Sequence, residues 1–119
     1  MSAVQVIEIL RATGEPSRLR ILALLARGEL AVMELCHILD QSQPRVSRHL
    51  KLLSEAGLAE RWPDGAGVFY RLTGEAGPRA VGCERRGRID PTDPVLARDA
   101  ERLAEVQAGR SEDAAAYFA

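Results

Sequence analysis

Side chains that bind phosphates and base edges recur along one short segment, SQPRVSRHLK at residues 42–51. Helical spacing predicts that Val46 and Leu50 are buried and that one face presents only cationic, amide and hydroxyl groups. That face carries Gln43, Arg45, Ser47, Arg48 and Lys51. No acidic residue interrupts it before Glu55, whereas an ordinary solvated helix face usually mixes both signs of charge. A solvated face is the alternative, but the pattern favours a surface that binds nucleic acid.

The segments before this face predict the elements that position it. Apolar residues at helical spacing predict helices over residues 3–12, from Pro16 to the stop at Gly28, and over 32–39. Leu30 and Ala31 could form a very short strand. The turn DQSQP follows, with Ser42 placed to cap a helix that ends before Gly57. A short helix, a tight turn and a basic-faced helix form a helix-turn-helix.

The segments after this face predict a hairpin and a long helix. LAERW and VFYRLT have strand character, and Asp64-Gly65 between them is a strong hairpin signal. Residues 79–89 predict at most a helical turn. Asp93 is placed to cap an amphipathic helix over residues 94–108, and residues 111–119 predict a separate short helix.

Composition limits the class of protein. With 119 residues, 46% hydrophobic and 28% charged, the chain fits one soluble domain with an aliphatic core, because aromatic residues make up only 4%. No apolar run is long enough for a membrane span, and the N-terminus lacks the basic start of a secretory signal, so we expect a cytoplasmic protein. Two histidines and scattered acids assemble no nucleophile with a base, so we expect no enzyme.

The charge is unevenly distributed along the chain. The net charge is −1, which alone argues against a polyanion ligand. Residues 1–89 nevertheless carry 13 Lys and Arg against 10 Asp and Glu, whereas residues 90–119 carry three against seven. Since local charge decides whether DNA can dock, a mildly basic body with an acidic C-terminal segment remains compatible with DNA binding.

Residues 3–72 resemble the ArsR/SmtB family of bacterial repressors, and the helix over 94–108 matches the last, dimerising helix of that family. The resemblance rests on the run S-x-x-x-V-S-x-H-L-x-x-L-x-x-A-G-L over residues 42–58. It implies a mainly α fold with a small β-hairpin, a winged helix-turn-helix, that dimerises through its terminal helices. Residues 1–90 would form the DNA-binding part, and 91–119 the dimerisation helix and tail of the same domain. The expected function is a homodimeric repressor of double-stranded operator DNA, released by a small inducer.

The resemblance also assigns candidate DNA contacts. Base or groove contacts are expected from the N-terminal half of the basic helix, and phosphate contacts from its flanks and from the hairpin. The candidates are Ser42, Gln43, Arg45, Ser47, Arg48, His49, Lys51, Arg61 and Arg71. His49 has two equal interpretations, a phosphate contact or a hydrogen bond within the domain. The hairpin tip departs from the family pattern, since it brings Asp64 and no cation.

Residues that could bind the inducer are harder to identify. Many relatives bind metal through Cys-x-Cys in the first motif helix, but here Cys36 is followed by His37 and Ile38. The last helix has Asp99 but no histidine. We therefore expect no metal site and no cofactor, with Cys36 a small buried residue. A redox pair of Cys36 with Cys83 remains an alternative.

The C-terminal segment suggests an alternative function. Residues 90–119 are similar to the segment that joins an ArsR-type head to an S-adenosylmethionine-dependent methyltransferase in some fused proteins. The chain could then be a free-standing relative or the head of a fusion. In the alternative, the winged fold is a dimerisation or interaction module without DNA binding of its own. The net charge and Asp64 favour this alternative, and the cationic face of residues 43–51 opposes it.

Overall fold

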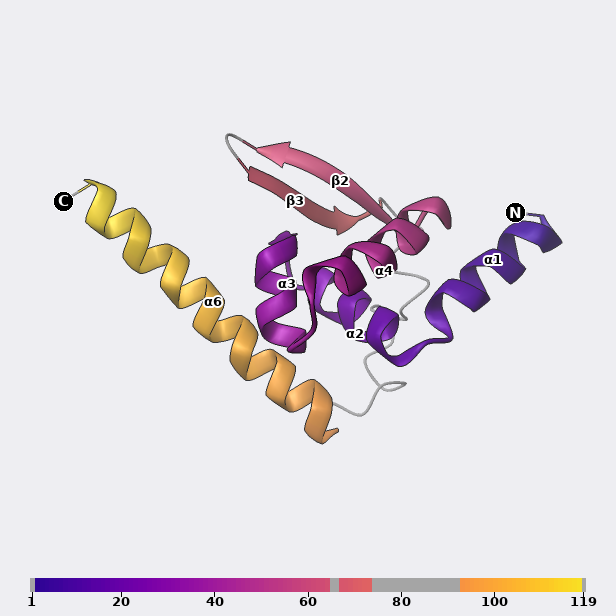
Figure 1. Ribbon diagram of the computed structural model, residues 1–119, viewed down its shortest axis with the longest axis horizontal. Helices are drawn as coiled ribbons and strands as arrows, with labels where there is room; N and C mark the ends of the chain where they lie inside the picture. Colours follow the sequence, from indigo (N-terminus) through magenta and orange to yellow (C-terminus); the bar gives the residue numbers. More distant parts are fainter. Residues whose placement is uncertain (1, 65–66, 74–92, 119) are drawn as a thin grey trace.

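The computed structural model describes residues 2–64, 67–73 and 93–118, and within them a small sheet lies on one side of a group of helices (Figure 1). The helices are α1 (Ala3–Thr13), α2 (Pro16–Leu25), α3 (Val32–Leu39), α4 (Gln43–Glu55) and α6 (Pro94–Phe118). The strands are β1 (Leu30–Ala31), β2 (Ala59–Asp64) and β3 (Gly67–Leu72). The predicted mainly α fold with a hairpin is confirmed. The helical turn predicted over residues 79–89 and Cys83 lie outside the described residues.

The hairpin is part of a three-stranded antiparallel sheet with the order β1-β3-β2. The short strand considered at Leu30 and Ala31 is present, and Leu30 pairs with Tyr70. In the hairpin Ala59 pairs with Leu72 and Asp64 with Gly67. Because Leu30, Leu58 and Ala59 are buried, this sheet is anchored to the helical core at its base.

One aliphatic cluster joins the helices. Its fully buried members include Leu35 and Ile38 of α3 together with Val46 and Leu50 of α4. α2 packs against α4 and adds Ile21 and Leu22 to this cluster, and α6 adds Leu103. The predicted contact of the two motif helices is therefore confirmed, and the polar side of α4 is left outside the core.

The helix ends follow local chemistry, with one correction to the sequence predictions. Ser42 occupies the N-cap position of α4 as predicted, but the capping hydrogen bond expected from its side chain is not formed. The N-terminus of α3 has no side-chain cap at Ala31, yet the Glu34 carboxylate accepts the Ala31 N–H at 2.9 Å. The cap predicted at Asp93 is confirmed, since its Oδ1 accepts N–H groups of the first turn of α6. Gly57, with φ of 75°, follows α4 as predicted.

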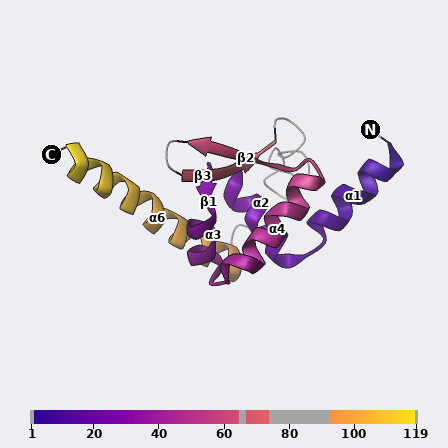
Figure 2. The same ribbon diagram turned by 45° about the horizontal axis from the view of Figure 1, so that its top comes forward.

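The last helix is longer than predicted. α6 runs without a break to Phe118, whereas the sequence predicted one helix over 94–108 and a second short helix. No proline interrupts it, Gly109 is tolerated within it, and an alanine run continues it. In both views α1 and α6 extend from the core in opposite directions (Figures 1 and 2). None of the described helices has the length and apolarity required to cross a membrane.

Candidate nucleic-acid interface

The polar face of α4 is a continuous exposed surface, which we call the reading face. It consists of Gln43, Arg45, Ser47, Arg48 and Lys51, all exposed. On the opposite side of the helix Val46, Leu50 and Leu53 are completely buried. The predicted division of α4 into a buried apolar side and an exposed cationic side is therefore confirmed, and the reading face is rigidly backed by the core.

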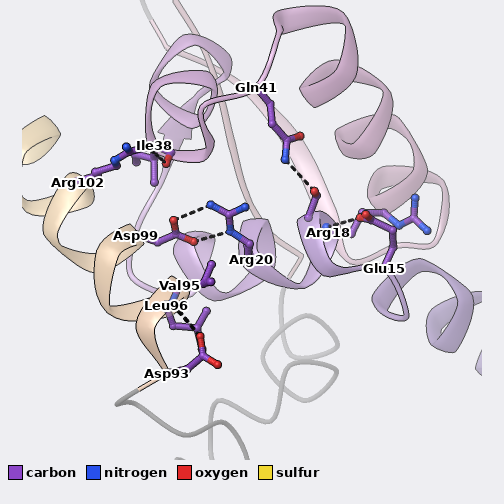
Figure 3. Close-up of polar contacts among 11 residues, drawn as sticks. Glu15, Arg18, Arg20, Ile38, Gln41, Asp93, Val95, Leu96, Asp99 and Arg102 are labelled. Carbon is purple, nitrogen blue, oxygen red and sulfur yellow. Dashed lines mark hydrogen bonds and ion pairs between the residues drawn. The ribbon is translucent and has the colours of Figure 1, made fainter.

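The turn before α4 fixes where the reading face begins. Asp40 adopts a left-handed conformation, with φ of 55°, and ends α3. The Gln41 side chain then donates a hydrogen bond from Nε2 to the buried Ser17 Oγ of α2 at 2.9 Å (Figure 3). Ser42 is exposed beside the first turn of α4, where free backbone N–H groups and the helix dipole favour an anion.

His49 lies in the interior and not on the reading face. Its side chain is buried, and neither ring nitrogen has a hydrogen-bond partner among the described residues. Nδ1 is 3.8 Å from Oε2 of Glu15, which also accepts the Arg18 N–H at the start of α2. Burial lowers the pKa of His49, nearby arginines lower it further, and Glu15 opposes them. This placement favours a role of His49 within the domain over a phosphate contact, although the hydrogen bond expected there is not formed among the described residues.

The two candidate arginines of the hairpin lie on opposite faces of the sheet. Arg61 pairs with Tyr70 and is exposed, whereas Arg71 pairs with Glu60 across the strands. Arg71 Nε lies 2.5 Å from Glu60 Oε1, and its guanidinium lies 3.7 Å from the centroid of the Trp62 ring. Arg71 is thus bound within the hairpin, and Arg61 is the more exposed of the two arginines. The stacking of Arg71 on Trp62 was not predicted from the sequence, although the register between β2 and β3 would have indicated it.

The candidate sensing residues do not converge. Within residues 2–64, 67–73 and 93–118, no three His, Cys, Asp or Glu side chains lie close enough to hold a metal ion. Cys36 is half-buried, and burial raises the pKa of its thiol. His37 is exposed on α3, and Asp99 is bound by Arg20. The candidate sensing residues are therefore not part of a three-ligand group among the described residues.

Known proteins are similar to this chain in sequence and in fold. Residues 15–61 match the family described as bacterial regulatory protein, arsR family. Over 99 residues the chain is 41% identical to the arsenic resistance transcriptional regulator ArsR1 of Pseudomonas putida, covering 82% of this chain and 77% of that protein. The reduced form of HlyU from Vibrio cholerae superposes with a TM-score of 0.66 at 30% identity, covering 74% of this chain and 93% of that chain.

A further solved structure bears on assembly. It is the homodimeric winged helix-turn-helix DNA-binding domain of a possible ArsR-family regulator from Mycobacterium bovis. It superposes with a TM-score of 0.63 at 32% identity, covering 67% of this chain and 74% of that chain.

Proposed function

The chain belongs to the ArsR family of bacterial regulatory proteins, and we propose that it controls transcription as a homodimer that reads operator DNA with α4. The winged helix-turn-helix domain is a DNA-binding regulator and not an enzyme. The observation that carries the assignment of α4 is its reading face, because it is exposed, free of acidic residues and backed by fully buried side chains.

The proposed contacts follow from the position of each side chain. We assign groove and base contacts to Gln43, Arg45, Ser47 and Arg48, because the N-terminal half of the second motif helix enters the major groove. Ser42 and Lys51 lie at either end of this set and suit phosphates. Arg61 projects from the hairpin towards a flanking backbone. Arg71 and His49, which the sequence also placed among the DNA contacts, are better suited to supporting the hairpin and α4.

The dimer is proposed to form through the terminal helices. Val4, Ile7 and Leu10 of α1 follow one another at three-residue spacing, and they are 65%, 48% and 62% exposed. Apolar patches of this kind usually mark a protein contact. A second copy would cover them. The division into a DNA-binding part over residues 1–90 and a dimerisation segment over 91–119 remains a proposal, and the burial of Leu103 in the common core supports one domain.

Release from DNA is proposed to follow binding of a small inducer. ArsR1 of Pseudomonas putida, to which this chain is similar, is named for arsenic resistance. A single thiol would bind arsenite only weakly. Cys36 is the described thiol, and its raised pKa lowers the fraction of thiolate, which is the form that binds a soft metal. We therefore infer that an inducer site within the described residues does not depend on Cys36 alone.

The test is the salt dependence of binding to duplex DNA. Fluorescence anisotropy with a random duplex should give an affinity that falls steeply with salt, since each phosphate contact contributes roughly one counterion to the slope. Arg45→Ala/Arg48→Ala should reduce both affinity and slope, with Arg27→Ala, an exposed arginine after α2, as the matched control. A wild-type dimer that ignores DNA at low salt would instead identify an interaction module without DNA binding.

A further inference from the structure

α6 holds α3 at both of its ends through two arginines. Arg102 Nη1 donates a hydrogen bond to the Ile38 carbonyl in the last turn of α3 at 2.9 Å (Figure 3). Arg110 Nε donates to a carboxylate oxygen of Glu34 in the first turn of α3 at 2.6 Å, and Arg110 Nη2 donates to the Glu29 carbonyl at 3.1 Å. The two helices therefore run antiparallel. We call Arg102 and Arg110 the α6 bracket.

A buried ion pair fixes where α6 lies on the core. Both carboxylate oxygens of Asp99 accept hydrogen bonds from the Arg20 guanidinium of α2, each at 2.8 Å. Asp99 is only 2% exposed, so a displacement of α6 would leave a buried charge without its partner. A two-point contact between planar groups also defines orientation. α6 is therefore held in one position, from which the bracket reaches α3.

The bracket acts next to the turn that leads into α4. The Ile38 carbonyl is two residues before Asp40, whose left-handed backbone begins the turn. α2 holds the other side of the same turn through Gln41 and Ser17 (Figure 3). Because α3 and α4 share one fully buried cluster, a rotation of α3 carries α4 with it.

We propose that Arg102 and Arg110 are positioning residues for operator recognition. They transmit the orientation of α6, the helix assigned above to the dimer, to α3 and therefore to the reading face of each protomer. The two reading faces of a dimer must fit two half-sites that lie one turn of the DNA helix, about 34 Å, apart. The bracket would then set which half-site spacing the dimer accepts. This inference rests on the proposed function, and it adds residues that touch no DNA.

The test is a selection of operators from a random duplex pool by the wild-type protein, Arg102→Ala and Arg110→Ala. The variants should select the same half-site sequence, because the reading face is unchanged, but with a broader range of spacings. Their affinity for the wild-type operator should fall about tenfold, the loss expected from one charged hydrogen bond. Their affinity for random duplex DNA should stay within about twofold, and Arg102→Lys should recover part of the loss.

Controls separate this inference from the proposed function and from a merely structural role. Arg98→Ala, an exposed arginine on α6, should behave as wild type. Unchanged spacing and operator affinity in both bracket variants, with a wild-type protein that binds DNA, would overturn only the inference. A parallel loss of operator and random-duplex affinity, or unfolding of both variants, would also overturn it, because the bracket would then maintain the fold. A wild-type protein that binds no DNA would overturn both proposals.

Discussion

At the residue scale, the same cationic segment contains side chains with different roles. Arg45 and Arg48 are exposed on the reading face, whereas His49, the next residue, is buried with its ring nitrogens unpaired among the described residues. The sequence left both roles of His49 open, because its position in the helix places it at the boundary between the two faces. Only the packing of α2 against α4, which brings Glu15 to 3.8 Å, favours one of them.

The burial of His49 predicts a pH-dependent stability. Its pKa is lowered in the folded protein, by burial first and then by Arg18, Arg45 and Arg48, against the attraction of Glu15. Below its ordinary value near 6.5 the unfolded chain therefore binds more protons, and the free energy of unfolding falls as the pH falls. Denaturant unfolding at pH 7.5 and 5.5 should show this loss in the wild-type protein and a smaller loss in His49→Gln.

A matched variant checks the origin of this effect. His37→Gln removes the other histidine of the chain, which is exposed, and should keep the pH dependence of the wild-type protein. Equal slopes for the wild-type protein and His49→Gln would show that His49 is not buried as a neutral group in solution.

At the element scale, local signals predicted the motif well and distant contacts poorly. α4 was predictable because Pro44, Gly57 and the apolar spacing all lie within the segment itself. Glu34, at the third position of α3, accepts the Ala31 N–H as the glutamate of a capping box does, although Ala31 has no side-chain oxygen to complete the box. The α6 bracket joins residues more than 60 positions apart, so no local pattern could indicate it. The reading face was predictable, and its supports were not.

The register of the hairpin predicts different roles for its two arginines. Arg61→Ala should weaken binding to duplex DNA and reduce the salt dependence by about one phosphate contact, because Arg61 is an exposed cation on the hairpin. Arg71→Ala should leave that salt dependence unchanged and lower the stability by about 0.5–1 kcal/mol, because it removes a cation–π contact and a cross-strand pair. Anisotropy titrations and denaturant unfolding measure the two effects.

Trp62 gives this prediction an independent readout. It is the single tryptophan of the chain, and the Arg71 guanidinium lies over its ring. Its fluorescence should therefore change in Arg71→Ala and not in Arg61→Ala. A weaker salt dependence of DNA affinity in Arg71→Ala would instead identify Arg71 as a phosphate contact, as the sequence first indicated.

At the scale of the whole molecule, binding and assembly depend on different surfaces. The reading face belongs to α4, while α1 and α6 extend from the core on opposite sides (Figures 1 and 2). A single protomer presents one reading face and leaves the apolar side of α1 uncovered. Two copies would cover this side and present two reading faces, which matches the two-fold symmetry of a pseudo-palindromic operator. Assembly is therefore expected to control affinity without changing any contact to DNA.

Ile7→Asp tests this separation of surfaces. A carboxylate in the centre of the apolar side of α1 would be buried without a partner on pairing, so the dimer should dissociate in size-exclusion chromatography with light scattering. Operator affinity should fall by at least tenfold, since a monomer can contact only one of the two half-sites. Met33→Asp is the matched control, because Met33 is also an exposed apolar residue but lies on α3 and not on a terminal helix. If Ile7→Asp remained a dimer while Met33→Asp dissociated, the pairing surface would include α3, and the α6 bracket would lie beside it.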